Sequence, residues 1–265
     1  MHDRLKDKVA LVAGAGSVGP GWGNGKAAAA LFAREGAKVF AVDINHAAAD
    51  QTRDIIRSEG GVCESYQADV TKAEQVRAMV DACVERFGRV DVLQNNVGDS
   101  APGGAVEMTE EDWDAQMAFN LKSAFLTCKY VLPVMERQGR GAVVNVSSIA
   151  GVQYLGRDMA AYYAAKAGLL QFTKATAMRY VKQGIRCNCV IPGLMHTPLV
   201  AHRIADQYGD GDVDEAIAKR DAMCPTGKMG DGWDVAYTSL FLASDEAKYV
   251  TATELLVDGG LSAKF

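Results

Sequence analysis

Short apolar runs rich in β-branched residues alternate along the chain with longer segments whose apolar residues recur every three or four positions. The short runs predict strands at Val9–Ala13, Lys38–Asp43, Cys63–Gln67, Val90–Asn95, Ala142–Ser147, Ile185–Val190 and Glu254–Val257. The longer segments predict helices at Gly25–Glu35, Ala47–Ser58, Lys72–Phe87, Glu110–Arg137, Ala161–Gln183 and Trp233–Ala243. This alternation is typical of βαβ units, so we expect one α/β domain over residues 1–265. Seven parallel strands should form a doubly wound sheet with helices on both faces.

Several helix ends and one irregular segment are also visible. Thr71-Lys-Ala-Glu74 has the form of a capping box, and Gly36, Gly88 and Gly184 stand where helical patterns stop. Residues 199–232 contain a polar helical stretch, broken at Tyr208-Gly-Asp-Gly, and no predicted strand. Because ligands bind beyond the carboxyl ends of parallel strands, we expect this segment to be a substrate lid.

Composition removes several classes of partner. The 28 basic and 33 acidic side chains give a formal charge of −5, and there is no run of Lys or Arg. We therefore expect no nucleic-acid partner. No apolar stretch approaches the roughly 20 residues that span a bilayer, so we expect no membrane partner and a cytoplasmic protein. The six cysteines include no CxxC pair and no companion histidine cluster, which favours reduced thiols and no metal site.

A glycine-rich segment follows the first predicted strand and precedes a helix. Two registers fit it, Gly14-x-Gly16-x-x-Gly19 and Gly14…Gly23-x-Gly25. The first would place three glycines inside the helix, each costing up to about 1 kcal/mol relative to alanine. We therefore expect the helix to start near Gly23, after an unusually long loop. Glycines and a helix N-terminus together suit a pyrophosphate, so the sheet is predicted to be Rossmann-like, with a dinucleotide held by Gly14, Ser17, Gly23, Asn24 and Gly25.

Asp43 ends the second predicted strand, 18 residues after Gly25. An acidic residue there accepts hydrogen bonds from the adenosine ribose and repels a 2′-phosphate, which predicts NAD rather than NADP. Alternatively, Asp43 only caps its own turn. Asp69 is predicted to bind the adenine edge, or alternatively to place charge at the start of the next helix. Their neighbours Ile44 and Val70 belong to the same predicted cofactor site.

Tyr162 and Lys166 are four residues apart and therefore share one face of a helix. A phenol has an ordinary pKa near 10, and a nearby ammonium group lowers that value towards a range useful for proton transfer. Tyr163 is a rival to Tyr162, but it lies three residues before Lys166. We expect Tyr163 to serve packing instead.

Further motifs in the same order make the whole chain resemble the short-chain dehydrogenase/reductase family. Asn95-Asn96-Val97-Gly98 resembles the family's NNAG, Asn120 its helix asparagine, and Val146–Gly151 its catalytic-serine strand end. Arg186-Cys-Asn-Cys-Val-Ile-Pro-Gly-Leu-Met-His-Thr197 resembles its RxNxxxPGxxxT segment, and Asp258-Gly259-Gly260 its DGG. The glycine loop departs from the family pattern, because Ala13 replaces a threonine and about five residues are added around Gly19–Trp22. Val97 also replaces the usual alanine.

The resemblance implies hydride transfer between NAD(H) and a secondary alcohol or ketone. Tyr162 is implied to exchange the proton, Lys166 to lower its pKa and hold the nicotinamide ribose, Ser148 to stabilise the substrate oxygen, and Asn120 to hold a water. Ser147 and Ser148 should face opposite ways, and counting back three from Gly151 selects Ser148. The further cofactor residues implied are Asn95, Val97, Gly98, Pro192, Gly193, Met195 and Thr197.

Segments that follow the strands predict where the substrate pocket lies, but more than one function remains open. Its walls should come from Asp99, Ser100, Tyr154, Leu155, Met159, His196 and Leu199, which favour an apolar, ring-bearing small molecule. A non-catalytic NAD-binding sensor or scaffold is the alternative from another class. An enoyl reductase is a minor alternative, because that branch of the family typically spaces its tyrosine and lysine farther apart. The resemblance also implies a homotetramer with long helices at an interface.

Overall fold

A parallel sheet forms the centre of the molecule, as predicted. The structure is a computed structural model that describes residues 3–199, 202 and 213–264. Seven strands pair in the order β3-β2-β1-β4-β5-β6-β9, and every pair is parallel. Their bounds are β1 Val9–Ala13, β2 Lys38–Asp43, β3 Val62–Gln67, β4 Val92–Asn95, β5 Gly141–Val146, β6 Ile185–Pro192 and β9 Glu254–Val257.

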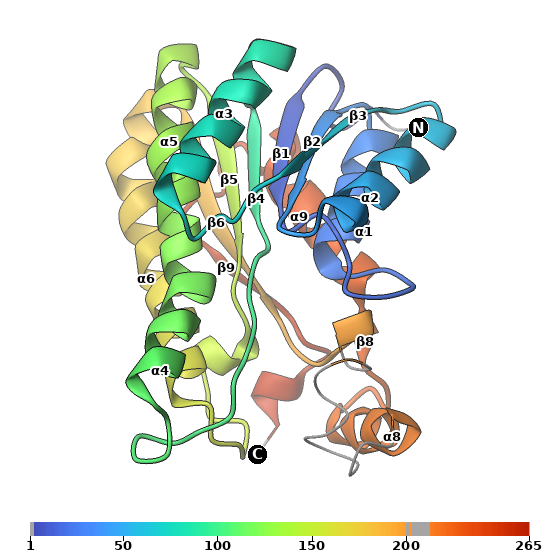
Figure 1. Ribbon diagram of the computed structural model, residues 1–265, viewed down its shortest axis with the longest axis vertical. Coiled ribbons are helices and arrows are strands. Elements are labelled where there is room, and N and C mark those ends of the chain that lie inside the picture. The colour runs from blue at the N-terminus through green and yellow to red at the C-terminus, as the bar shows by residue number, and fades with distance from the viewer. Residues whose placement is uncertain (1–2, 200–201, 203–212, 265) are drawn as a thin grey trace.

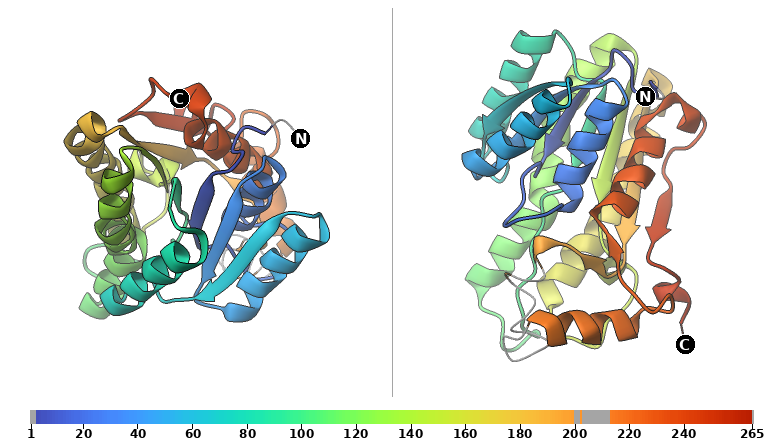
Figure 2. Two further views of the ribbon diagram at one scale, coloured as in Figure 1. Left: turned by 90° about the horizontal axis from the view of Figure 1, so that it is seen from above. Right: turned by 90° about the vertical axis from the view of Figure 1, so that its right-hand side faces the viewer.

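Helices cover both faces of this sheet (Figures 1 and 2). One face carries α1 Asn24–Arg34, α2 His46–Ser58 and α9 Gly232–Ala243, and the other α3 Ala73–Phe87, α5 Ser123–Gln138 and α6 Ala160–Tyr180. Two further helices, α4 Glu110–Met117 and α8 Val213–Met223, lie beyond one end of the sheet. Among the described residues, no helix is both long and apolar enough to cross a membrane.

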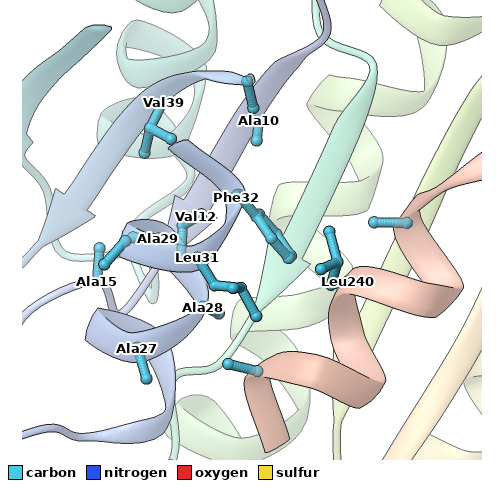
Figure 3. Packing of buried hydrophobic residues seen from close by; sticks show 14 of the residues in the cluster. Ala10, Val12, Ala15, Ala27, Ala28, Ala29, Leu31, Phe32, Val39 and Leu240 are labelled. Atoms are coloured by element: carbon cyan, nitrogen blue, oxygen red, sulfur yellow. The ribbon is translucent and has the colours of Figure 1, made fainter. Parts of the chain in front are cut away.

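Small residues allow one helix to approach the sheet closely. Ala27–Ala30 of α1 are fully buried, and Leu31 and Phe32 lie near Leu240 of α9 (Figure 3). Close packing of this kind fixes the position of the helix relative to the strands. The start of α1, which borders the glycine-rich loop, is therefore set by the core.

The predicted helix Glu110–Arg137 is helical throughout, but a π turn that was not predicted interrupts it. It consists of α4, a π-helical turn η1 at Ala118–Lys122, and then α5. A π turn keeps its residues helical, so the spacing of apolar residues in the sequence does not reveal it. Asn120 lies in this turn, and its Nδ2 donates to the carbonyl oxygen of Gln116 at 2.9 Å.

The capping box predicted at Thr71 is also wrong. Lys72 is the N-cap residue of α3 and makes no side-chain cap. The Thr71 hydroxyl instead donates to Asp69 Oδ1 at 2.6 Å. The helix ends near Gly36, Gly88 and Gly184 are confirmed, since all three glycines have positive φ angles.

The long glycine-rich loop packs against the far end of the chain. Gly23 is the N-cap of α1, which confirms a helix start near that residue. The ring of Trp22 lies 4.7 Å from that of Trp233 in α9, and the Arg34 guanidinium lies 4.9 Å from the Trp233 ring. The added residues are thus partly anchored by aromatic and cation–π contacts.

Part of the expected lid falls outside the described residues, namely 200–201 and 203–212. The rest contains α8 and a two-residue strand, β8 Gly230–Asp231, which pairs with β7 Met195–His196. The expectation that 199–232 holds no strand was therefore wrong. The six cysteines are buried and have free thiols.

We expect Gly25→Ala to destabilise the protein by at least about 2 kcal/mol. A Cβ atom at this position would lie 1.9 Å from the carbonyl oxygen of Gly14, so the backbone would have to move. Urea unfolding measures the loss. Gly23→Ala is the matched control, because its Cβ meets nothing nearer than 3.7 Å. Equal stability of the two variants would contradict this account of the turn.

Candidate active site

Two adjoining pockets open at the carboxyl ends of the strands. The first, the long pocket, runs from the glycine-rich loop past Asp43 and Asp69 to Tyr162 and Lys166. The second, the adjoining pocket, lies between the β4 and β5 ends, α6, the β6 end and α8. The residues lining both are Asn24, Gly98, Ser147, Tyr162, Thr197 and Leu199.

Most residues predicted to bind the cofactor line these pockets. The long pocket contains Gly14, Ser17, Gly23, Asn24, Asp43, Ile44, Asp69, Val70, Val97, Gly98, Tyr162, Lys166 and Thr197. The adjoining pocket contains Pro192, Gly193 and Met195. Gly25 and Asn95 lie one layer deeper, where Gly25 packs against the Gly14 carbonyl and Asn95 is buried behind the wall. Asn96, rather than Asn95, lines the long pocket.

The polar atoms of the long pocket suit a dinucleotide. Ser17 Oγ, Asn24 Oδ1 and Asn96 Oδ1 are buried and have no hydrogen-bond partner within the described part of the chain. Buried polar atoms of this kind are costly unless they are hydrogen-bonded. All three residues line the pocket beside the N-terminus of α1, so a phosphate- and ribose-bearing molecule supplies suitable partners.

Both acidic residues of this pocket are held by nearby backbone groups. Asp43 accepts from Gly16 N at 2.9 Å through Oδ2 and from Asn45 N at 3.0 Å through Oδ1. Asp69 Oδ1 accepts from the Thr71 backbone N–H at 2.9 Å. The alternative interpretation of Asp43 as a turn cap is therefore compatible with a ligand role. The same bonds that cap the turn fix the carboxylate in the pocket.

The two serines at the end of β5 have different partners. Ser148 shares a side-chain hydrogen bond with Tyr162 and accepts from Ala150 N at 3.1 Å. Ser147 Oγ donates to the carbonyl oxygen of Lys166 at 2.9 Å and is buried. This geometry favours Ser148 as the serine that faces a substrate.

Tyr162 and Lys166 lie on one face of α6, and Lys166 Nζ is 5.7 Å from the centre of the Tyr162 ring. Lys166 Nζ donates to the carbonyl oxygen of Val146 at 3.1 Å, so the ammonium group is tied to the end of β5. Gly98 leaves room for it, because a Cβ there would lie 2.9 Å from Lys166 Nζ and 2.8 Å from Asn120 Oδ1. Gly98 thus lets Lys166 and Asn120 approach the same point.

Asn120 is fixed by the loop after β4. Its Nδ2 donates to the Asp99 carbonyl oxygen at 2.8 Å, and its Oδ1 accepts from Asp99 N at 3.1 Å. Together with the bond to Gln116, these contacts use both amide protons and one lone pair of Oδ1. One lone pair of Oδ1 is left for a further donor.

Burial controls the protonation of the pair. Burial raises the pKa of Tyr162 and is the largest effect. The hydrogen bond from Ser148 and the charge of Arg220 lower this pKa, whereas the charge of Asp99 raises it. Burial also lowers the pKa of Lys166 to about 8. We expected Lys166 to lower the pKa of Tyr162 towards neutral pH. In the structure the pKa of Tyr162 is instead raised. Burial is the largest cause of the shift for both groups.

A buried hydrogen-bond network supports this site from below. Asn95 Nδ2 donates to Asn145 Oδ1 at 2.8 Å, and Asn145 Nδ2 donates to Thr173 Oγ1 at 2.8 Å. Thr127 Oγ1 donates to Asn95 Oδ1 at 2.7 Å. The network connects β4, β5, α5 and α6, so the structure gives Asn95 a supporting position.

The adjoining pocket includes five of the seven residues predicted for it, Asp99, Ser100, Leu155, Met159 and Leu199. Tyr154 and His196 do not line it. Tyr154 is 65% exposed and packs against Tyr163, whose hydroxyl accepts from Leu155 N and donates to the Arg157 carbonyl oxygen. Tyr163 therefore has the packing role that we expected. His196 is exposed in β7.

Sequence reasoning missed four residues of this pocket, Ile149, Arg157, Leu194 and Arg220. Ile149 directly follows Ser148 in the sequence, and Arg157 lies two residues before Met159. Their positions next to predicted site residues could have marked them as pocket residues. Arg220 lies on α8, in a segment that the sequence pattern marks only as polar. Nothing local distinguishes Arg220 from a surface arginine, although it is only 5% exposed.

Comparisons with known proteins agree with this architecture. A family model described as "Enoyl-(Acyl carrier protein) reductase" matches residues 20–262. The chain is 38% identical over 262 residues to 2,5-dichloro-2,5-cyclohexadiene-1,4-diol dehydrogenase LinX of Sphingobium indicum, covering 99% of each chain.

Two solved structures are also similar over nearly their whole length. A putative short-chain dehydrogenase/reductase from Burkholderia xenovorans is 50% identical, with a TM-score of 0.94 and 99% of each chain covered. Levodione reductase is 32% identical, with a TM-score of 0.92, covering 98% of this chain and 99% of that one. With this fold, these motifs and these relatives, the chain belongs to the short-chain dehydrogenase/reductase family of oxidoreductases.

Proposed function

We propose that this protein transfers a hydride between NAD(H) and a secondary alcohol or its ketone. The observation that carries the proposal is that Ser148 and Tyr162 line the adjoining pocket together, while Tyr162 and Lys166 also line the long pocket. A substrate oxygen beside both hydroxyls can exchange a proton with one and receive a hydrogen bond from the other. The long pocket holds the dinucleotide, and the adjoining pocket holds the substrate.

The bound nicotinamide supplies the hydride acceptor or donor, and the chain handles the proton. In oxidation, Tyr162 takes the proton from the substrate hydroxyl while the hydride leaves the carbon that bears this hydroxyl. Ser148 donates to the substrate oxygen and stabilises its developing charge. Reduction reverses both transfers, so the alcohol and its ketone are substrate and product of one site.

Lys166 and Asn120 complete the proton path. A pKa of about 8 allows Lys166 to gain or lose a proton near neutral pH. The remaining lone pair of Asn120 Oδ1, close to the same point beside Gly98, accepts from a water that leads towards solvent. These two residues therefore return Tyr162 to its starting protonation state after each turnover.

Asp43 supports NAD as the cofactor, because its fixed carboxylate accepts from ribose hydroxyls and repels a 2′-phosphate. The adjoining pocket is walled by apolar residues, including Leu155, Met159, Leu194 and Met195. The relative LinX is named for a cyclohexadiene-diol. Together these observations favour a ring-bearing secondary alcohol as substrate.

Enoyl reduction is the second candidate, since the matching family model carries that description. It differs in reducing a carbon–carbon double bond. Crotonyl thioester with NADH tests it directly. Oxidation of NADH by this compound, without activity on any alcohol or ketone, would favour the second candidate over our proposal.

We expect Tyr162→Phe to lower kcat for alcohol oxidation by about 10²- to 10⁴-fold, because the variant lacks the group that takes the proton. NADH formation at 340 nm, over cyclic, aromatic and aliphatic secondary alcohols, measures the effect. Tyr163→Phe makes the same chemical change one residue away and should keep most of the turnover. Equal activity of Tyr162→Phe and the wild type would reject the proposed role. Cofactor binding without turnover across the whole panel would favour a non-catalytic sensor or scaffold.

We expect Asp43→Ser to raise the ratio of kcat/KM with NADP to kcat/KM with NAD by at least about tenfold. The variant removes both the carboxylate acceptor and its charge. Asp69→Asn is the control in the same pocket. This variant should weaken the binding of NAD and NADP to the same extent. An unchanged ratio in Asp43→Ser would refute Asp43 as the selecting residue.

We expect Lys166 to make folding stability depend on pH. The ordinary pKa of a lysine side chain is 10.5, and burial lowers the pKa of Lys166 to about 8 in the folded protein. Between these values the unfolded chain binds the proton and the folded chain does not, so the free energy of unfolding rises with pH. Relative to Lys166→Met, the wild type should gain about 3 kcal/mol from pH 7.5 towards pH 10.5.

Urea unfolding of the wild type and Lys166→Met across this pH range tests that gain. Lys174→Met is the control. Lys174 lies on the same helix, α6, but it is partly exposed and forms an ion pair with Glu254 of β9. A constant difference between wild type and Lys166→Met would show that the folded pKa of Lys166 is not lowered.

A further inference from the structure

A separate cavity, the amino-end cavity, lies at the amino ends of the strands, at the end of the sheet opposite α4 and α8 (Figure 1). Its lining includes Lys8 just before β1, Gly141 at the start of β5 and Ile185 at the start of β6. Its volume of about 500 Å³ falls within the range typical of small-molecule sites. Strand β5 leads from this cavity to Ser148, a distance of about 20 Å. No described residue lines both this cavity and a pocket of the active site, so the two places are distinct.

Positive charge exceeds negative charge around the amino-end cavity. Its charged lining residues are four cations and two carboxylates, namely Lys8, Arg140, Arg186, Lys248, Asp91 and Asp245. Asp91 is already paired at 2.6 Å with a fifth cation, Arg89, which is not part of the lining, and Arg140 reaches Asp91 only at 3.6 Å. Asp245 accepts from Lys8 Nζ at 2.5 Å. Five cations therefore share two carboxylates.

Arg186 is held in place by uncharged groups. Its Nη1 donates to the Leu242 carbonyl oxygen at 2.6 Å, and its Nη2 donates to the Ser244 carbonyl oxygen at 3.0 Å. The carboxylate that acts on Arg186 is Asp245, and Lys8, Arg186 and Arg140 all lower the pKa of Asp245. One carboxylate thus serves three cations. A second anion in the cavity would meet cations that the chain itself neutralises only in part.

Lys248 adds to this excess at the rim of the amino-end cavity. It is exposed and makes no ion pair within the described part of the chain. Next to it, Tyr249 is 99% exposed, and Met178 at the end of α6 is 66% exposed. Both side chains line the cavity. Large apolar groups with this exposure gain free energy when a ligand covers them, and the Tyr249 ring offers a face for stacking.

We propose that the amino-end cavity binds an aromatic phosphate monoester. A phosphate monoester carries nearly two negative charges and three acceptor oxygens at neutral pH, so it can pair with Arg140, Arg186 and Lys248 together. Its aromatic group lies against Tyr249 and Met178. The ligand binds and does not react, and this site is independent of the chemistry proposed for Tyr162.

Titration calorimetry of the intact protein with phenyl phosphate tests the site. We expect saturable binding, about 3- to 10-fold tighter than that of inorganic phosphate, because the ring adds contacts with Tyr249 and Met178. Benzyl alcohol has the ring without the charge, and it should bind at least about tenfold more weakly than phenyl phosphate. Absence of saturable binding, or equal binding of benzyl alcohol, would overturn the proposal.

Two variants separate the charge from the ring. Lys248→Gln should weaken phenyl phosphate and inorganic phosphate alike by about 3- to 10-fold, since it removes one cation from both complexes. Tyr249→Ala should weaken phenyl phosphate by a similar factor and leave inorganic phosphate unchanged. Both side chains are exposed, so neither substitution disturbs the core. Unchanged binding of phenyl phosphate in both variants would place the ligand elsewhere.

Matched controls make the same changes outside the cavity. Lys182 is an exposed cation two residues before Gly184 of the lining, and Tyr237 is an exposed tyrosine on α9. Neither lines the cavity, so Lys182→Gln and Tyr237→Ala should bind both phosphates as the wild type does. If Lys182→Gln weakened binding as much as Lys248→Gln, the effect would be a general one of net charge, and the proposal would be rejected.

The long pocket also suits phosphate groups, so the titration is repeated with NADH at saturating concentration. Phenyl phosphate should bind the complex with NADH as tightly as the free protein, because the amino-end cavity lies at the other end of the sheet. Loss of binding in the presence of NADH would assign the phosphate to the long pocket and overturn the proposal. Failure of every alcohol and ketone as a substrate, with phenyl phosphate still bound through Lys248 and Tyr249, would reject the dehydrogenase and leave this site standing.

Discussion

The site depends on a pair of hydrogen bonds between the end of β5 and α6. Ser147 Oγ donates to the Lys166 carbonyl oxygen at 2.9 Å, and Lys166 Nζ donates to the Val146 carbonyl oxygen at 3.1 Å. They hold strand and helix in one register, so Ser148 after β5 and Tyr162 on α6 line the same pocket. Both bonds are buried, which makes leaving either of them unformed costly. A strand and a helix, rather than loops, therefore position the groups that we propose to react.

The polar network below the site extends this constraint through the core. Asn95, Asn145, Thr127 and Thr173 pair with one another where apolar side chains would pack as well. Hydrogen bonds are directional, so they fix the positions of α5 and α6 along the sheet. Apolar contacts alone would define these positions less sharply. The network gives a role to the first residue of the NN pair at the end of β4. Asn95 points into this network, and Asn96 lines the long pocket.

The sequence pattern predicted the sheet, most helices and most of the lining of the long pocket, because each depends on local features. Glycines, strand-end acids and the Tyr162–Lys166 spacing all lie within single turns or motifs. It could not predict the π turn at Asn120, since the residues of such a turn remain helical and apolar spacing does not distinguish it from an α-helical turn. Arg220 was also missed, because only the packing of α8 makes it a pocket residue. The same holds for the raised pKa of Tyr162, which comes from burial by distant segments.

The contact between the glycine-rich loop and α9 has a consequence for synthesis. A Cβ at Gly232 would lie 2.9 Å from the Trp22 carbonyl oxygen, and Trp22 stacks near Trp233, so the loop is completed by residues more than 200 positions later. A chain still emerging from the ribosome has β1, α1 and Asp43 early but lacks this support. The glycine-rich loop therefore reaches its final packing only after α9 has been made.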